Sequence, residues 1–329
     1  MHRDMRIEPS KRKRRKNMPI SIPKIAGIHE KLPSGLSYPV NLMVASPESR
    51  RKSTFVHPHV RMDSSTEWCF IEIDKDVSIS SPAFCFFQMS GELSLIKLIE
   101  LGYELCGSYT SPVIKRNDLC DKINARFPVS GGDNRSTKIA QNDLYGLPQL
   151  TNIKELKAFT SRMKGENQYN WVSRALRYIV DGSASPMETI LVMLLILPYK
   201  YGGYGLPAPE LNKRINTRKE ATYRPGKVYY ICDLFWPKAN LAVEYDSDAY
   251  HTGTYHIVKD SKRRLELTML GIDVITVTGN QVRDIPSFER IAKLIAQRLH
   301  KRLQYDNSKF LKAQHNLRDI LLNSEKYEG

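Results

Sequence analysis

The chain has 329 residues, of which 41% are hydrophobic, and a formal net charge of +15 at pH 7. This composition excludes wholesale disorder, allows one large domain or two smaller ones, and favours an anionic partner, most commonly nucleic acid. Because the longest apolar run (190–198) is far shorter than the ~20 residues that span a bilayer, and the five cysteines form no CxxC pair, we expect a soluble cytoplasmic protein with no membrane partner.

Residues 1–20 are expected to form a basic, flexible arm. The first 52 residues contain 13 Lys and Arg against 4 Asp and Glu, and the run Lys11–Lys16 carries much of that excess. Such a run either binds phosphates without sequence preference or is a solvated tail, and the sequence leaves both open.

Residues 21–130 are expected to form an N-terminal α+β domain. Short apolar segments separated by turn residues predict strands between 38 and 88, and helical spacing of apolar residues predicts a helix across 91–109. Residues 131–150 are rich in Gly, Asn, Ser and Asp, which predicts a linker.

The second half predicts a mixed α/β domain over 151–310 and a tail over 311–329. Two helices, 152–165 and 167–182, precede a third that begins after Ser185, with Pro186 at its first position and Glu188 three residues after the cap. The pattern that follows predicts three strands, a helix, a strand and a helix, at 209–215, 227–236, 240–247, 254–271, 272–278 and 287–303. This order is typical of a mixed sheet with a hairpin at its centre.

Several carboxylates gather on that hairpin. In the strand 240–247, a period of two places Glu244 and Asp246 on one face, and the hairpin can bring Asp233 of the preceding strand beside them. Carboxylates held together among apolar residues repel one another unless a cation is present. Hard divalent cations take oxygen ligands, so the pattern predicts a site for Mg²⁺ or Mn²⁺ that can act on a phosphodiester.

The same residues resemble the PD-(D/E)XK nuclease superfamily, and within it the branch related to very-short-patch-repair endonucleases. The matching pieces are Asp233 followed by Glu244-x-Asp246, then Asp260-x-x-Arg263-x-x-x-Leu267-x-x-x-Gly271, and "SPMET" at the start of the third helix. They span about 185–285. The resemblance implies a restriction-endonuclease-like fold, a central mixed β-sheet flanked by helices, and metal-dependent hydrolysis of DNA.

The resemblance also implies roles for single residues. Asp233 and Glu244 are expected to bind the metal, and Asp246 either binds it or orients His251. His251 is expected to be a general base toward the attacking water, although a surface histidine would have the same local sequence. Glu188 either closes a capping box or reaches the metal from the helix end. The resemblance places Asp260 near the site and assigns phosphate contact to Arg263, with three further basic candidates, Lys259, Lys262 and Arg264; a simple ion pair within the helix also explains Asp260 and Arg263.

The sequence therefore predicts a DNA endonuclease, acting in defence, repair or a toxin–antitoxin setting. The N-terminal half is faintly similar to antitoxin regulators of the abortive-infection type, and no functional residue follows from that similarity. A catalytically inactive DNA-binding or antitoxin-like regulator with the same fold is the alternative, and an RNA substrate stays open.

Overall fold

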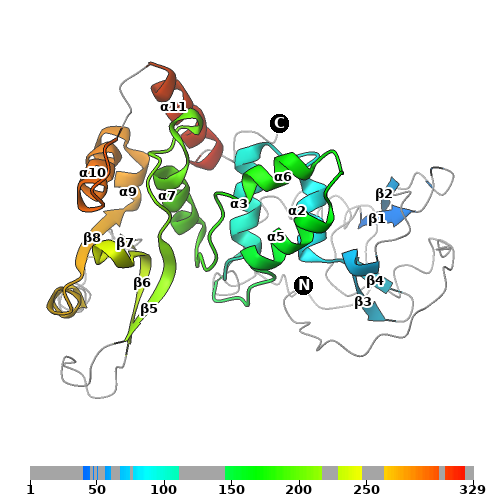
Figure 1. Cartoon of the computed structure of the whole chain (residues 1–329), viewed down its shortest axis with the longest axis horizontal. Helices are drawn as coiled ribbons and strands as arrows, with labels where there is room; N and C mark the ends of the chain where they lie inside the picture. The colour runs from blue at the N-terminus through cyan, green and yellow to red at the C-terminus, as the bar shows by residue number, and fades with distance from the viewer. Residues whose placement is uncertain are drawn as a thin grey trace, which may run out of the picture. The chain divides into compact units, whose positions relative to one another are not determined.

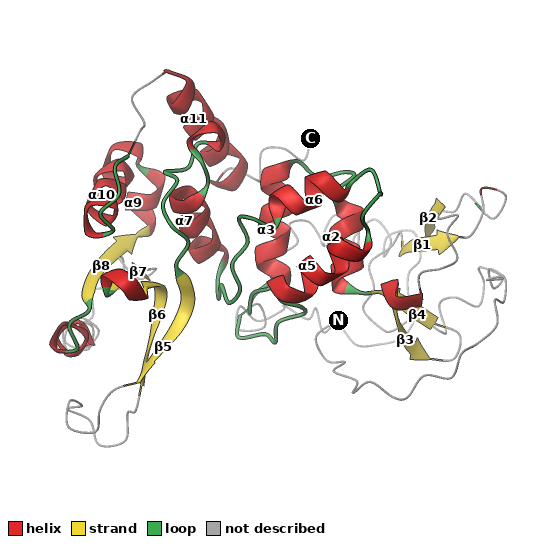
Figure 2. Cartoon of the chain, viewed as in Figure 1, coloured by secondary structure: helices red, strands yellow, loops and turns green. Residues whose placement is uncertain are grey.

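The helices and strands of the chain are shown in Figures 1 and 2. The structure is a computed structural model that describes residues 40–44, 47, 50, 56–60, 67–74, 77–110, 145–216, 229–246, 263–303 and 308–322. Two compact units divide the chain, one formed by Met1–Cys85 with Val113–Asn134 and the other by Phe86–Pro112 with Arg135–Gly329. The described part is mixed α/β, with several small sheets, as the sequence predicted at that level.

The described strands of the first unit form two small sheets. Strand β1 (Val40–Val44) pairs with β2 (Val56–Val60) in parallel, and β3 (Phe70–Asp74) pairs with β4 (Val77–Ser80) in antiparallel fashion. The short helix η4 (Glu67–Cys69) leads into β3. These strands agree with the alternating pattern expected in this region.

Helix α2 (Pro82–Met89) corrects one prediction, because its residues were expected to belong to a strand. The amide of Phe84 donates to the hydroxyl of Ser81 (3.3 Å), and Pro82 stands at the first helical position. Both features begin a helix. The apolar run that follows is nearly continuous, so its periodicity does not distinguish a helix from a buried strand.

Three helices open the second unit: α3 (Leu95–Leu105), α5 (Ile153–Arg162) and α6 (Tyr169–Ala175). The side chains of Ser94 and Asn152 cap α3 and α5 by accepting backbone N–H groups of the first turn. Each helix buries one apolar face.

Helix α7 (Pro186–Ile196) is the most deeply buried helix among the described residues. Ser185 caps it and Pro186 occupies the first turn, as predicted, and Ile190–Ile196 is buried on every side. A helix that is apolar all round belongs in a core. The chain then passes through η6 (Tyr199–Tyr201) and returns against the end of α7, where Tyr204 and Leu206 donate backbone hydrogen bonds to its last carbonyl groups.

A four-stranded mixed sheet follows, in the order β5 (Glu210–Asn216), β6 (Tyr229–Trp236), β7 (Leu241–Asp246) and β8 (Asp273–Thr278). The first three strands are antiparallel neighbours, and β8 runs parallel to β7. The predicted hairpin is therefore confirmed: η8 (Pro237–Ala239) joins β6 to β7, and Asn240 makes the turn at φ 47°.

The ladder between β6 and β7 is much shorter than the strands themselves. It pairs Leu234–Trp236 with Leu241–Val243 and stops there, although β6 begins five residues earlier and β7 continues to Asp246. On the other side, the β5–β6 ladder skips the pair Asn212 and Asp233. The central strands thus separate beside the carboxylates, and their unpaired backbone groups need side-chain partners.

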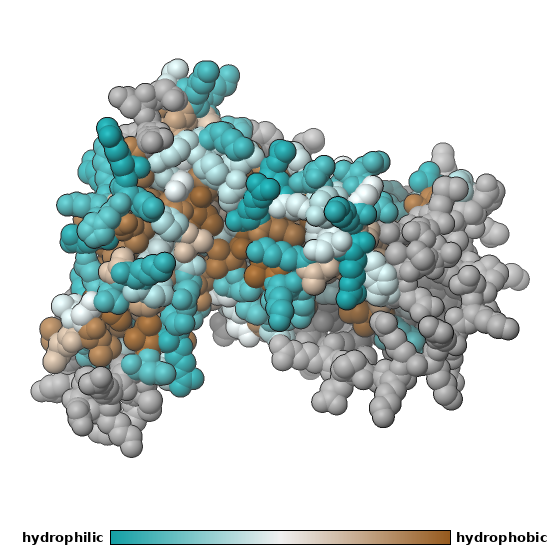
Figure 3. Space-filling model, in the orientation of Figure 1, coloured by the Kyte–Doolittle hydropathy of each residue, from teal (hydrophilic) through white to brown (hydrophobic). Residues whose placement is uncertain are grey.

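Residues 263–269 form a helix, as expected, and Gly271 ends it at φ 75°. Leu267 of this helix lies in one buried cluster with Tyr230, Cys232, Phe235, Ala242 and Ile272. Helices α9 (Gly279–Arg283) and α10 (Ile285–Arg298) follow β8. Helix α10 confirms the helix predicted at 287–303, but it ends at Arg298. Figure 3 shows how apolar and hydrophilic side chains share the visible surface of this unit.

Helix α11 (Ser308–Leu322) packs against α7 and η6 and was not predicted. Its buried residues Phe310, Leu317 and Leu321 have helical spacing, so the signal was present in what was interpreted as a tail. No helix in the described ranges is long and apolar enough to cross a membrane.

Candidate active site

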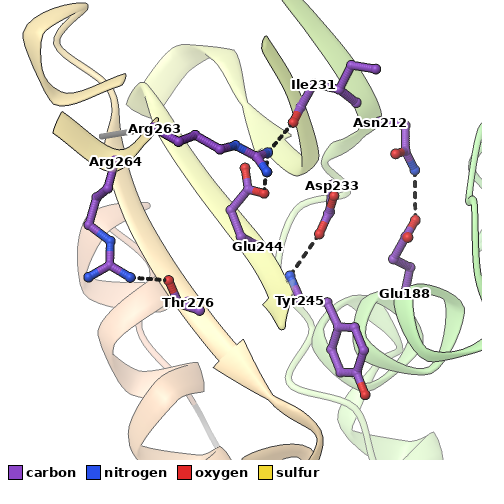
Figure 4. Close-up of polar contacts among 9 residues, drawn as sticks. All are labelled: Glu188, Asn212, Ile231, Asp233, Glu244, Tyr245, Arg263, Arg264 and Thr276. Atoms are coloured by element: carbon purple, nitrogen blue, oxygen red, sulfur yellow. Dashed lines mark hydrogen bonds and ion pairs between the residues drawn. The ribbon is translucent and has the colours of Figure 1, made fainter. Parts of the chain in front are cut away.

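Glu188, Asp233 and Glu244 approach one another where β6 separates from β7 (Figure 4). They come from three elements: the first turn of α7, the middle of β6 and the second half of β7. The sequence predicted that Asp233 and Glu244 lie at one site and left open whether Glu188 reaches it.

Glu188 is held by four hydrogen bonds. Its amide donates to the hydroxyl of Ser185 (3.1 Å), and that hydroxyl also lies 3.1 Å from Oε1 of Glu188. Oε2 accepts the backbone N–H of Ala184 (2.9 Å) and the side-chain amide of Asn212 (2.7 Å). The Ser185 half of the predicted capping box is therefore present, whereas the Glu188 carboxylate accepts the N–H of Ala184 in place of that of Ser185, and Asn212 adds a contact that a capping box does not need.

Asn212 belongs to β5 and was missed by the sequence analysis. Its backbone has φ 46°, a conformation rare for residues other than glycine, and its amide donates to the carbonyl of Gly182 as well as to Glu188. The signal was faint, because an asparagine in a strand is notable only once its backbone angle is known.

The side chain of Asp233 replaces a backbone hydrogen-bond acceptor that the β6–β7 ladder does not provide for Tyr245. Its Oδ2 accepts the N–H of Tyr245 at 2.8 Å, at the point where the β6–β7 ladder has already ended. The carboxylate is therefore fixed on β7 while its own strand diverges. This contact matches the expectation that the hairpin places Asp233 beside the second half of β7.

Glu244 is paired with Arg263, the first described residue of the helix 263–269. The guanidinium Nη2 donates to Oε2 of Glu244 at 2.6 Å and also to the backbone carbonyl of Ile231 (Figure 4). The Glu244 side chain is only 13% exposed, against 37% for Arg263. Oε1 of Glu244 is buried and receives no N–H or O–H among the described residues, and only the weakly donating thiol of Cys232 adjoins the carboxylate.

Burial dominates the electrostatics of the site. It raises the pKa of Glu244 to about 7, and the negative charge of Asp233 adds to this against the opposing charge of Arg263. Burial also raises the pKa of Asp233, while the Tyr245 N–H and Arg263 lower it. The pKa of Glu188 is raised first by burial and then by Asp233. Asp233 thus raises the pKa of both glutamates, and Glu188 raises that of Glu244, which indicates that the three carboxylates lie near one another.

The donor set suits a hard cation, but its arrangement is not that of a finished metal centre. Within the described ranges, no group of three or more His, Cys, Asp and Glu side chains converges closely enough to hold an ion. The buried Oε1 of Glu244 without a strong donor, beside a second carboxylate, fits a cation ligand. Arg263 is the cation that the structure places on Glu244.

The other predicted residues divide into two groups. Asp246 ends β7 opposite Thr278 of β8, and Arg264 donates to the hydroxyl of Thr276 at 2.7 Å. His251, Lys259, Asp260 and Lys262 lie outside the described residues. Arg263, for which the resemblance implied phosphate contact, pairs with Glu244.

Comparison with known proteins gives two relatives in Mycobacterium tuberculosis. They are "Uncharacterized protein MT2308" of strain CDC 1551 / Oshkosh and "Uncharacterized protein Rv2248" of strain ATCC 25618 / H37Rv. Each is 31% identical over 130 residues, which is 39% of this chain and 42% of the relative. The chain thus spans less than half the length of the relatives that it matches. No family model and no solved structure matches significantly.

Proposed function

We propose that the chain is a divalent-metal-dependent endonuclease that hydrolyses DNA phosphodiester bonds on a restriction-endonuclease-like fold. The observation that carries the proposal is the group of buried carboxylates where β6 separates from β7: burial, and after it the negative charge of Asp233, raise the pKa of Glu244 to about 7. Perturbed carboxylates at one place in a fold are typical of catalytic sites. The net charge of +15 suits a polyanionic substrate.

Asp233 and Glu244 would hold Mg²⁺ or Mn²⁺ in this mechanism, with Asp246 as a further candidate ligand at the end of β7. The bound ion supplies Lewis-acid polarisation of the phosphoryl oxygen and lowers the pKa of an attacking water. The protein's own part is to keep the acids close together. The Tyr245 N–H fixes Asp233, and Asn212 with the α7 cap fixes Glu188, so neither carboxylate can turn away to reduce the repulsion.

The test is cleavage of supercoiled plasmid by the full-length protein in Mg²⁺, in Mn²⁺ and in EDTA, beside Asp233→Asn. Asparagine keeps an oxygen that can accept the Tyr245 N–H, so the variant removes the charge with little change in shape. The matched control is Asp273→Asn on β8, whose carboxylate pairs with Arg298 at the surface. We expect metal-dependent nicking that is lost in Asp233→Asn and kept in Asp273→Asn. A single-stranded RNA substrate in parallel distinguishes the two nucleic acids.

A second candidate is a DNA-binding regulator that uses the same fold without cleavage. The observation in its favour is the Arg263–Glu244 pair, which neutralises one acid without a metal. It predicts salt-sensitive DNA binding with no cleavage in any metal, and binding that Asp233→Asn leaves unchanged.

A further inference from the structure

Arg263 reaches the carboxylates from the solvent side of the site. Its guanidinium contacts a carboxylate that is 13% exposed, while its own side chain is 37% exposed. One nitrogen, Nη2, serves both Glu244 and the carbonyl of Ile231, so the side chain bridges the two strands where their ladder has ended. Of the charged side chains at the site, Arg263 can move into water at the lowest cost in free energy, because it is already partly exposed.

A divalent cation and this guanidinium compete for the same carboxylate. Both are positive, and like charges a few ångströms apart in a partly buried site repel strongly. The described acids also do not yet converge on one point, so metal binding requires a rearrangement. Glu188 and Asp233 are each anchored to backbone N–H groups, which leaves the Arg263–Glu244 contact as the part of the site that can open.

We propose that Arg263 is a built-in counter-cation that exchanges with the divalent metal at Glu244. In the metal-free protein its guanidinium neutralises the carboxylate and bridges β6 to β7. Metal binding releases the guanidinium to the solvent side of the site, where it can meet an incoming phosphate. This inference rests on the proposed function for the identity of the competing cation.

Such an exchange makes the metal affinity of the natural protein lower than its carboxylates alone would give. Removing the competing cation strengthens metal binding by about 10- to 100-fold, the factor that corresponds to one charge-assisted hydrogen bond. A residue that merely supports the site has the opposite effect, because its loss loosens the ligands and weakens binding.

The experiment is calorimetric titration of Mn²⁺ into the full chain at pH 8, for the natural protein, Arg263→Met and Arg263→Lys. Arg298→Met is the matched control, because it removes another arginine–carboxylate pair, that with Asp273, away from the three acids. We expect a dissociation constant about 10-fold or more lower in Arg263→Met and unchanged in Arg298→Met. Arg263→Lys keeps the charge and loses the planar fork that reaches two acceptors, so a smaller gain is expected.

Equal or weaker Mn²⁺ binding by Arg263→Met overturns the inference, and if the natural protein binds Mn²⁺ in that experiment, the proposed function survives. No Mn²⁺ binding by any of the proteins overturns both. Circular dichroism checks that the variants fold. If Arg263→Met does not, Arg263→Lys decides alone: stronger binding supports the exchange, and unchanged or weaker binding overturns it.

Discussion

Replacing Glu244 by glutamine is expected to stabilise the metal-free protein at pH 8, although it removes an ion pair. The pKa of Glu244 is raised from 4.5 to about 7, with burial as the main cause. This value already includes the attraction of Arg263. The ionised carboxylate therefore costs the fold free energy in spite of its partner, and a neutral residue of similar shape removes that cost.

The sign and size follow from the two pKa values. A group whose pKa is higher in the folded protein contributes stability below its unfolded value, here 4.5, and that contribution is lost as the pH rises through 7. At 1.36 kcal/mol for each pH unit, the ionised Glu244 costs about 3 kcal/mol at pH 8. We expect Glu244→Gln to recover about 1–3 kcal/mol of the free energy of unfolding at pH 8. The gain is smaller than the full cost because Arg263 loses its charged partner and must be solvated by water instead. The gain should shrink as the pH falls toward 4.5.

The assay is urea unfolding in EDTA at pH 8 and pH 5, followed by circular dichroism. The control is Glu210→Gln on β5, where the carboxylate pairs with Lys213 at 2.5 Å but is 48% exposed. An exposed pair of this kind contributes about 0–1 kcal/mol, so the control should change little at either pH. A Glu244→Gln protein that is less stable than the natural one at pH 8 would refute the reasoning, since the ion pair would then outweigh the cost of burial.

Three further substitutions test the surroundings of the site by urea unfolding. Asn212→Ala should cost about 2–4 kcal/mol, because it removes two hydrogen bonds and leaves at positive φ an alanine, which tolerates that conformation less well than asparagine. Asn212→Gly loses the same hydrogen bonds but adopts positive φ without strain, so it should cost about 1–2 kcal/mol less; equal losses would contradict the backbone argument. Ser185→Ala should cost about 1 kcal/mol through the lost α7 cap, and a neutral result would mean that the Ala184 N–H and the Asn212 amide are enough to hold Glu188. Arg318→Met should be neutral or stabilising, because two of that buried guanidinium's nitrogens have no hydrogen-bond partner among the described residues; a loss above about 2 kcal/mol would show that the contact to Val282 outweighs the burial of charge.

Local sequence signals predicted much of this part of the fold. The Ser185 cap, the hairpin turn at 237–239 and the stop at Gly271 depend on a few neighbouring residues, and all three are present. The prediction for 82–88 was wrong because a nearly continuous apolar run has no clear period. The capping hydroxyl of Ser81 was the better signal there.

The site itself depended on contacts that no local pattern contains. The sequence placed Asp233 and Glu244 on adjacent strands, and the structure agrees. It did not predict that the two strands separate there, since ladder length is set by what packs between them. Nor did it predict that Arg263 would bind Glu244, because the same residue at the start of a helix can equally face solvent or phosphate.

Glu188 and Glu244 differ in how completely hydrogen-bond donors satisfy their carboxylate oxygens, and this difference indicates different roles. Glu188 has donors on both oxygens and closes the cap of α7, so its position is explained by structure alone. Glu244 is nearly as enclosed, yet among the described residues its Oε1 has no strong donor, and its Oε2 pairs with the partly exposed Arg263. A buried carboxylate with an unsatisfied oxygen lowers the stability of the fold at neutral pH, so a purely structural role does not explain it. A ligand that binds the Oε1 oxygen of Glu244 would therefore stabilise the protein more than one that binds Glu188. Glu188 is the residue that holds the strands and helix α7 in place around that oxygen.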